Sequence, residues 1–278
     1  MRILISGCSF TAGDLVIHHP ETGLIINNEQ PTWVDHLTRV FNADVNNVAL
    51  GGNSNDKICR KAFEELYDPT DPGYDYVIIQ WTALHRQERY SAMIKEWVNF
   101  CNTGKVKIDN PYSKVSDKIT SLYDWHTDDA KYTDDTTANI GLERTFDLTN
   151  KAMTAELMYG KSIQDFRIEY FKTVLTMQQA LQQRNIPYLF TSMANGTHIP
   201  TIARGGNIFD GISVDDALCE YERELLKEID MERWTTVPMT HMMEGNQVSH
   251  DDSHPNPYGH KLIYKHIKTE FYNKEMKL

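Results

Sequence analysis

The sequence predicts an α/β fold, a three-layer α/β/α sandwich around a mostly parallel sheet of about five strands. From the N-terminus, short runs of β-branched residues alternate with amphipathic segments in the order strand, helix, strand, helix, strand. The same alternation returns in the C-terminal half. Hydrophobic residues make up 40% of the 278 residues, enough for a sizeable core. We expect one domain that spans residues 1–278.

Five elements are expected in the N-terminal part of the chain. The clearest strand signal is the uncharged run YVII, and the first strand, RILIS, ends at Gly7. Pro31 suits the start of the first helix, and Ser54 is a candidate N-cap of the second. In order, we expect a strand at residues 2–6, a helix at 31–41, a strand at 43–50, a helix at 54–68 and a strand at 74–81.

The C-terminal part adds three helices and two strands. Phe166, Tyr170, Val174 and Leu181 recur at helical spacing, and Ser213 is the expected N-cap of a second, strongly helical stretch. The last segment is amphipathic and closes the chain as a helix. In order, we expect a helix at residues 166–185, a strand at 186–193, a helix at 213–230, a short fifth strand at 235–239 and a helix at 255–272.

Residues 101–150 interrupt this alternation. The segment is rich in Asp, Thr, Lys and Tyr and has little hydrophobic periodicity. Two interpretations stay open: a long surface insertion, or a lid or specificity element over the functional site, as long loops in enzymes often are.

Charge and cysteine usage exclude several classes of protein. The formal net charge of -11 argues against a nucleic-acid partner, which would need a concentrated basic face. The four cysteines are scattered without a CxxC pair, so we expect reduced thiols rather than disulfides or a cysteine-rich zinc site. The N-terminus lacks the features of a signal peptide, and no apolar stretch reaches about 18 residues. We therefore expect a cytoplasmic protein with no membrane partner.

Residues 250–260, HDDSHPNPYGH, carry the strongest chemical signal. Asp251 and His254 stand as D-x-x-H, a spacing that lets a carboxylate accept from the imidazole Nδ1–H and leaves Nε2 facing outward. Pro255 restricts the backbone of His254, Asn256 is a candidate cap, and Pro257 suits the first position of the last helix. The pattern predicts an oriented histidine.

An oriented imidazole needs a nucleophile within hydrogen-bond reach. Ser9 lies in ISGCSFTAGD, directly after the first strand, and Gly51-Gly52 and Trp81-Thr82 follow the second and third strands. Ligands of an open parallel sheet bind outside the carboxyl ends of its strands, so all three segments are expected at one rim. Gly51 and Gly52 are also plain candidates for turn glycines with positive φ, and Trp81 is a candidate for a core residue or for a wall of the pocket.

Three segments together resemble the SGNH hydrolases, the GDSL lipase and esterase superfamily. GCSFTAG resembles the family's first block, NVALGGNSN its second and DDSHPNPYGH its fifth, in family order. The resemblance covers roughly residues 1–90 and 186–275, and implies an SGNH-hydrolase fold with flavodoxin-like topology. It also implies that Ser9 is the nucleophile, His254 the general base and Asp251 its orienter. The amides of Ser9 and Gly52 would then form an oxyanion hole.

Two positions depart from the family pattern. Cys8 replaces the aspartate that usually precedes the serine, and the third block, normally G-x-N-D, reads QWTALHR. The asparagine that completes the oxyanion hole is therefore missing. The Thr82 hydroxyl is the expected replacement donor, and Asn53, Asn55 and His85 remain alternatives. The substituted block resembles that of SGNH-like proteins encoded by bacteriophages.

The resemblance implies an ester hydrolase that removes an acyl group, such as acetyl, from a carbohydrate or small-molecule ester without a cofactor or metal. A non-catalytic binding module for a glycan or protein, and an acyltransferase with the same triad, remain alternatives. His85 and Arg86 are candidates for binding a carboxylate or phosphate, or for a solvated loop. A metal site is a less favoured interpretation of the cluster formed by His250, Asp251, Asp252, His254 and His260, with His241.

Overall fold

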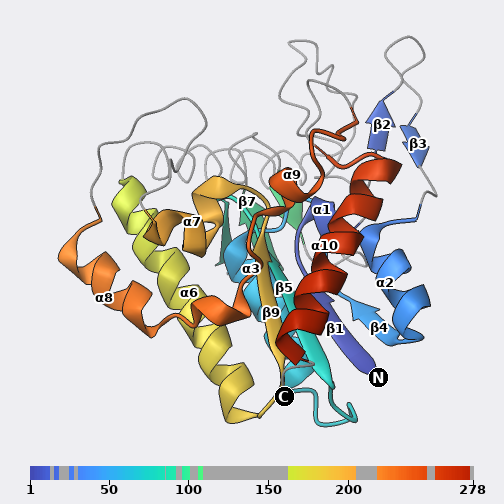
Figure 1. The fold of residues 1–278 in the computed structure, drawn as a ribbon. Helices are drawn as coiled ribbons and strands as arrows, with labels where there is room; N and C mark the ends of the chain where they lie inside the picture. The colour runs from blue at the N-terminus through green and yellow to red at the C-terminus, as the bar shows by residue number, and fades with distance from the viewer. Residues whose placement is uncertain are drawn as a thin grey trace, which may run out of the picture.

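The computed structural model describes residues 1–12, 16–18, 25–27, 31–84, 86–91, 96–100, 106–108, 162–204, 218–248 and 254–275. The predicted α/β fold is confirmed, with a parallel sheet covered by helices on both faces (Figure 1).

The central sheet has four strands in the order β4-β1-β5-β9, and every pair is parallel. The strands are β1 (Arg2–Ser6), β4 (Asp44–Asn47), β5 (Tyr76–Trp81) and β9 (Tyr188–Ser192). From β1 the chain first adds β4 on one side and then β5 on the other, so the strand order reverses beside β1. Ligands of open α/β sheets bind at such a reversal, outside the carboxyl ends of the strands.

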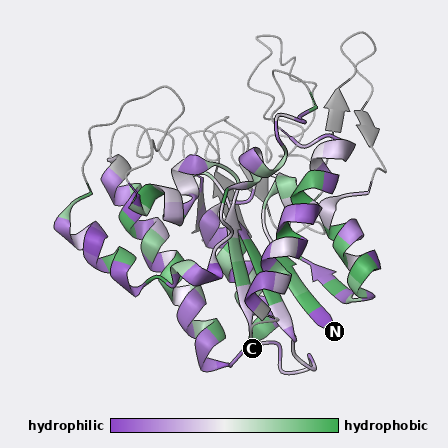
Figure 2. Ribbon diagram, viewed as in Figure 1, coloured by the Kyte–Doolittle hydropathy of each residue, from purple (hydrophilic) through white to green (hydrophobic). Residues whose placement is uncertain are grey.

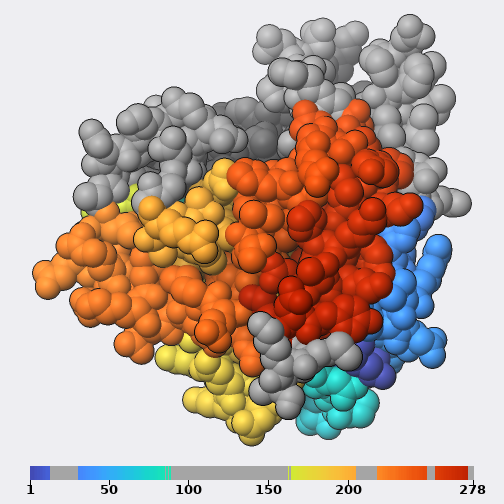
Figure 3. Space-filling model, in the orientation of Figure 1, coloured from blue at the N-terminus to red at the C-terminus, as the bar shows by residue number. Residues whose placement is uncertain are grey.

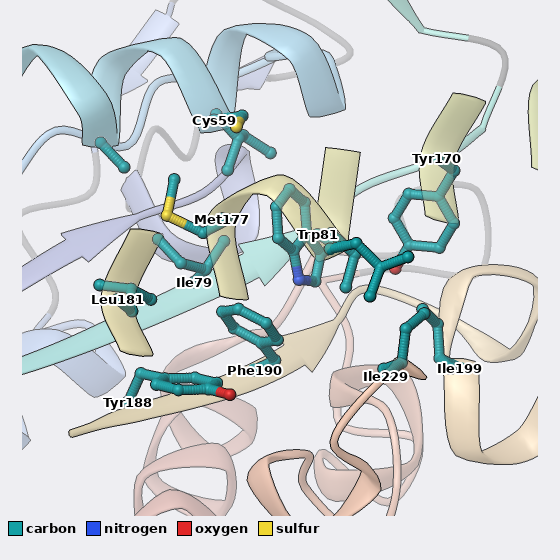
Figure 4. Packing of buried hydrophobic residues seen from close by; sticks show 14 of the residues in the cluster. Cys59, Ile79, Trp81, Tyr170, Met177, Leu181, Tyr188, Phe190, Ile199 and Ile229 are labelled. Carbon is teal, nitrogen blue, oxygen red and sulfur yellow. The ribbon is translucent and has the colours of Figure 1, made fainter. Parts of the chain in front are cut away.

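Successive side chains of a strand point to opposite faces of the sheet, so the strands contribute to two hydrophobic layers. The first lies between the sheet and the helices α3 (Asn55–Leu66) and α6 (Ile163–Gln183), with Leu4, Ile79 and Phe190 pointing into it. Figure 4 shows part of this layer around Trp81. The second lies between the sheet and the helices α2 (Trp33–Phe41), α9 (Met239–Met242) and α10 (Pro257–Glu275). Figure 2 shows hydrophobic residues concentrated in β1 and β5, and helices that alternate between hydrophobic and hydrophilic residues.

Local sequence signals set the helix starts. Thr32 and Asp35 form a capping box on α2, in which the Asp35 amide donates to Thr32 Oγ1 at 3.3 Å and Asp35 Oδ2 accepts from the Thr32 amide at 2.7 Å. Ser54 caps α3, as predicted, by accepting from the Lys57 amide. The last helix begins at Pro257, also as predicted.

The helix α2, near the N-terminus, packs against the C-terminal helix α10. Phe41 of α2 packs on Phe271 of α10 with ring centroids 4.9 Å apart, and the ring centroids of His36 and Tyr264 are 5.6 Å apart. In the space-filling view α10 (red) lies directly against α2 (blue) (Figure 3). This packing brings the segment before α10 to the same edge of the sheet as the segment after β1.

Two predicted details are wrong. The fifth strand expected at residues 235–239 is reduced to a single parallel bridge between Trp234 and Phe190, because Pro238 has no N–H for a ladder and α9 begins at the next residue. The helix α8 (Glu220–Glu228) is capped by Cys219 rather than by Ser213, which lies outside the described residues. The remaining short elements are α1 (Ser9–Ala12), α7 (Ile199–Ala203), η2 (Asn195–Thr197) and η3 (Met231–Arg233).

Two small antiparallel sheets were not predicted. One pairs β2 (Val16–His18) with β3 (Ile25–Asn27), and the other has the order β6-β7-β8, with strands Gln87–Ser91, Glu96–Phe100 and Val106–Ile108. Apart from β8, the insertion expected at residues 101–150 lies outside the described residues. Among the helices that the structure describes, none combines the length and apolar character needed to cross a membrane.

Candidate active site

Ser9 sits at the start of α1, in a tight turn directly after β1. The turn needs glycine at position 7, since a Cβ there would lie 2.8 Å from both Gln80 Oε1 and Thr11 Oγ1. Gln80 Oε1 accepts from the Cys8 amide at 2.9 Å and from Thr11 Oγ1 at 3.1 Å. A buried side chain of the neighbouring strand therefore fixes the backbone that carries Ser9.

The loop after β4 is tied to the same turn. The Gly7 carbonyl accepts from the Leu50 amide at 3.3 Å and from Asn53 Nδ2 at 2.9 Å. Gly52 has φ +76°, a conformation that favours glycine, whereas Gly51 has no positive φ. Both glycines therefore lie in the turn, but only Gly52 has the expected positive φ, and the loop lies beside the turn that carries Ser9.

Thr82 directly follows β5, at the same edge of the sheet as the Ser9 turn, and is fully buried. Its amide donates to Asn55 Oδ1 at 2.8 Å, and its carbonyl accepts from Asn55 Nδ2 at 3.1 Å. Its hydroxyl oxygen accepts from Arg86 Nη1 at 3.0 Å, which leaves the hydroxyl proton to be donated elsewhere. The side chain of Asn55 thus links the start of α3 to the end of β5 through two hydrogen bonds. These contacts give no support to Asn55 as an alternative oxyanion donor.

His254 is positioned by a turn that packs against residues 246–248. Its carbonyl accepts from the Val248 amide at 2.9 Å, and Asn256 Nδ2 donates to the Gln247 carbonyl at 3.1 Å. Asn256 Oδ1 accepts from the Gly259 amide at 2.9 Å, so the predicted cap is present. A Cβ at Gly259 would collide with the Asn246 carbonyl, so glycine is needed for this close approach.

The structure brings Ser9 and His254 together. His254 Nε2 lies 2.7 Å from Ser9 Oγ, across 245 positions of sequence. The His254 ring packs on Phe10, with ring centroids 5.3 Å apart. The Phe10 carbonyl accepts from Trp33 Nε1 at 3.1 Å. Helix α2 thereby holds the aromatic surface that supports the imidazole.

A second histidine lies behind this pair. His260 is buried, and burial is the main cause that lowers its pKa to about 4, with a smaller contribution from the nearby His36. Its Nδ1 accepts from the Trp33 amide at 3.4 Å, at the start of α2. A neutral His260 thus joins α10 to α2 and adds no positive charge beside His254.

The backbone N–H of Ser9 makes no hydrogen bond within the described residues. Asp251, the predicted orienter, lies outside those residues, as do His85, His250 and Asp252. No group of three or more His, Cys, Asp or Glu that could hold a metal ion occurs in the described part of the chain. His241 contacts Asn195 at 3.1 Å.

Sequence reasoning missed Gln80 and Phe10. Gln80 had a signal, since it is a lone amide inside the apolar run of a buried strand and such a group must find partners. Phe10 had none, because an apolar residue after a strand is expected in the core. Trp81, expected in the core or in a pocket wall, is fully buried in the layer beneath α6.

No protein-family model and no curated protein matches the sequence. Similar solved structures include a lipase from a goat rumen metagenome, at 12% identity, with 98% of each chain covered and a TM-score of 0.44. An esterase from Pseudoalteromonas, inhibited by monoethylphosphonate, is 12% identical over 98% of this chain and 97% of its own, with a TM-score of 0.42.

A third structure, described as a lipolytic protein of the G-D-S-L family from Desulfitobacterium hafniense, is 12% identical and has a TM-score of 0.43. The alignment covers 97% of this chain and 98% of that one. The chain is thus similar, over nearly its whole length and at low identity, to structures described as lipases, esterases and G-D-S-L family proteins.

Proposed function

We propose that the protein is a serine esterase that removes an acyl group from a carbohydrate or small-molecule ester. The observation that carries the proposal is the 2.7 Å distance between Ser9 Oγ and His254 Nε2. A hydroxyl and an imidazole nitrogen at this distance are the two groups that nucleophilic catalysis requires in contact. Their supporting turns, built on Gln80 and on Gly259, are consistent with a preorganised pair.

In the proposed reaction, Ser9 Oγ attacks the ester carbonyl while its proton passes to His254 Nε2. The imidazolium then protonates the leaving alcohol, and water, activated by the same nitrogen, releases the acid from the acyl-enzyme. Asp251 is proposed to accept from Nδ1–H of His254 and to fix this tautomer. That role rests on the D-x-x-H spacing in the sequence.

The developing oxyanion is proposed to be bound by the amides of Ser9 and Gly52 and by the Thr82 hydroxyl. The Ser9 amide makes no hydrogen bond within the described residues, and the Thr82 oxygen already accepts from Arg86. Donors that are fixed before the reaction stabilise charge without reorganisation, and each contributes about 3–4 kcal/mol.

The test combines a variant with a covalent probe. A fluorophosphonate should label the wild-type protein at Ser9, and Ser9→Ala should lose both the labelling and the hydrolysis of p-nitrophenyl acetate while it keeps the wild-type melting temperature. A folded Ser9→Ala protein with full turnover would remove the mechanism. An acyltransferase would form product faster when an acceptor alcohol is added, so rates with and without the alcohol separate that alternative from hydrolysis.

A non-catalytic binding module is the second candidate, and one observation favours it. The asparagine side chains near the third block are engaged within the fold, Asn55 with Thr82 and Asn53 with Gly7. Neither supplies the amide donor that the third block of the family normally carries. Absence of fluorophosphonate labelling at Ser9 in the folded wild-type protein would favour this candidate.

A further inference from the structure

Arg86 is a half-buried guanidinium with no ion pair in the described part of the chain. Its Nη1 lies 3.0 Å from Thr82 Oγ1 and 3.5 Å from the Asn53 carbonyl oxygen. Both contacts are to neutral groups, so the positive charge is not compensated by them. The chain as a whole carries a formal net charge of -11, which makes an unpaired cation beside the proposed nucleophile distinctive.

The guanidinium edge that usually holds a carboxylate is formed by Nε and Nη2. Arg60 uses this edge on Glu88, at 2.8 Å from Nε and 2.7 Å from Nη2, and Arg167 uses the same edge on Glu222. In Arg86 neither Nε nor Nη2 donates to a described residue, and Nε is buried. A buried donor without an acceptor is rare and calls for a partner.

Asn53, whose carbonyl Arg86 contacts, presents a matching acceptor. Its Oδ1 is buried and accepts from no described residue. The amide orientation is set by Gly7, because a carbonyl oxygen accepts and therefore faces Nδ2 rather than Oδ1. Two adjoining residues thus each have a buried polar side-chain atom without a hydrogen-bond partner, Nε of Arg86 and Oδ1 of Asn53.

Both residues lie next to the Ser9 turn. In the parallel pair of β1 and β5, Ser6 is opposite Ile79, so Ser9 and Thr82 follow equivalent points of adjacent strands. Adjacent strands are about 4.8 Å apart, which places Arg86, through its bond to Thr82, at the rim that carries Ser9. Asn53 reaches the same turn through Gly7.

We propose that Arg86 binds a carboxylate carried by the substrate, so that the protein prefers acidic esters to neutral ones. The inference rests on the proposed esterase function for the identity of the ligand as an ester. Nη2, which is not among the buried donors, would donate to a carboxylate oxygen of the substrate, and that carboxylate would compensate the charge of the guanidinium. Nη1 stays on Thr82 throughout.

The test measures binding without turnover. In the full-length Ser9→Ala protein, monomethyl succinate, which has one free carboxylate, should bind about tenfold or more tightly than dimethyl succinate by titration calorimetry. Adding Arg86→Met should reduce this preference to about twofold or less. Equal affinity for the two esters in Ser9→Ala, or a preference that survives Arg86→Met, would overturn the proposal.

Two further variants keep the outcome interpretable. Arg39→Met removes the same charge from the exposed surface of α2 and should preserve the preference. Arg86→Lys keeps the charge but lacks the planar guanidinium and its Nη2 donor, so if Arg86→Met does not fold, a several-fold loss of preference in Arg86→Lys supports the proposal and an undiminished preference refutes it.

Fluorophosphonate labelling of the wild-type protein separates this inference from the proposed function. If Ser9 is not labelled but Ser9→Ala still prefers the acidic ester through Arg86, the esterase proposal fails and the carboxylate site stands. If Ser9 is labelled and Ser9→Ala shows no preference for the acidic ester, the esterase proposal stands and the carboxylate site fails.

Discussion

The side-chain oxygen of Gln80 accepts a hydrogen bond from the backbone N–H of Cys8 at 2.9 Å, directly beneath the turn that carries Ser9. The same oxygen accepts from Thr11 Oγ1 at 3.1 Å, and Gln80 Nε2 donates to the Trp81 carbonyl at 2.6 Å. Gln80 is fully buried, so water cannot replace these bonds. The position of Ser9 therefore depends on a neutral amide from the adjacent strand.

We predict that Gln80→Leu destabilises the protein and slows the chemistry at Ser9. The substitution leaves the Cys8 amide and the Thr11 hydroxyl without their buried acceptor, which costs about 1–3 kcal/mol in the free energy of unfolding. A displaced turn also misaligns Ser9 with His254. Urea unfolding measures the first effect, and the rate of fluorophosphonate labelling of the folded fraction measures the second.

Gln183→Leu is the matched control, because Gln183 is exposed at the end of α6 and should change neither quantity. Wild-type labelling kinetics in a folded Gln80→Leu protein would show that Gln80 supports the fold without positioning Ser9.

We predict a larger effect for Gly259→Ala, since the added Cβ would collide with the Asn246 carbonyl. That carbonyl also accepts from the Asn256 amide at 3.1 Å, so the collision acts on the turn that presents His254. The melting temperature should fall and labelling of Ser9 should slow. Differential scanning fluorimetry and the labelling rate check both effects.

Gly73→Ala is the appropriate comparison. Gly73 has φ +95°, but a Cβ added there would meet nothing within 4 Å, so the cost is backbone strain of about 1–3 kcal/mol alone, far from Ser9. Gly73→Ala should lower the melting temperature without a change in the labelling rate. Equal labelling in the two variants would contradict the proposed link between Gly259 and His254.

The sequence was sufficient to predict the parallel sheet, because the strands β1, β5 and β9 are almost entirely buried runs rich in apolar residues and the helices carry clear caps. It also predicted that Ser9 and His254 meet, from two short segments that each fit the carboxyl rim of such a sheet. The polar contacts that position them were harder to predict. Gln80 was visible only as an amide in an apolar run, and its acceptor role depends on the register of β1 against β5.

Other elements were missed for identifiable reasons. The short strands β2, β3 and β8 have three residues each, too few for a period-2 pattern to stand out. The fifth strand was predicted because the run TTVPM has a strand-like composition. It does not form because Pro238 has no N–H to donate to a neighbouring strand. Cys219 was missed as an N-cap because cysteine is not among the residues that favour that position.

We predict that the protein loses stability as the pH falls from about 6.5 to about 4. Burial is the main cause that lowers the pKa values of His198 and His260 to about 4, from 6.5 for the unperturbed side chain. Between these values the unfolded chain binds the protons and the folded protein does not, so acid favours unfolding. Between these two pH values, each of the two histidines contributes about 1.4 kcal/mol per pH unit to the loss of unfolding free energy.

His198→Gln isolates one contribution. The carbonyl of Thr235 accepts from His198 Nε2 at 2.9 Å, and a glutamine amide can keep that bond while it removes the titration. The variant should be less stable at pH 7.5 but show a shallower loss of unfolding free energy toward pH 4.5, measured by urea titrations. A slope as steep as that of the wild type would exclude His198 as a source of the acid sensitivity.

Thr82→Val tests whether a hydroxyl replaces the missing third-block asparagine. Valine matches the shape of threonine and removes the hydroxyl, so the amide clamp from Asn55 to the Thr82 backbone should persist. If the hydroxyl binds the oxyanion, kcat for p-nitrophenyl acetate should fall about 100-fold or more with little change in KM, because the lost bond forms only in the transition state. Thr82→Ser should recover most of the rate. A folded Thr82→Val protein with wild-type kcat would instead show that the Ser9 and Gly52 amides suffice, and that the hydroxyl serves only to hold Arg86 at 3.0 Å.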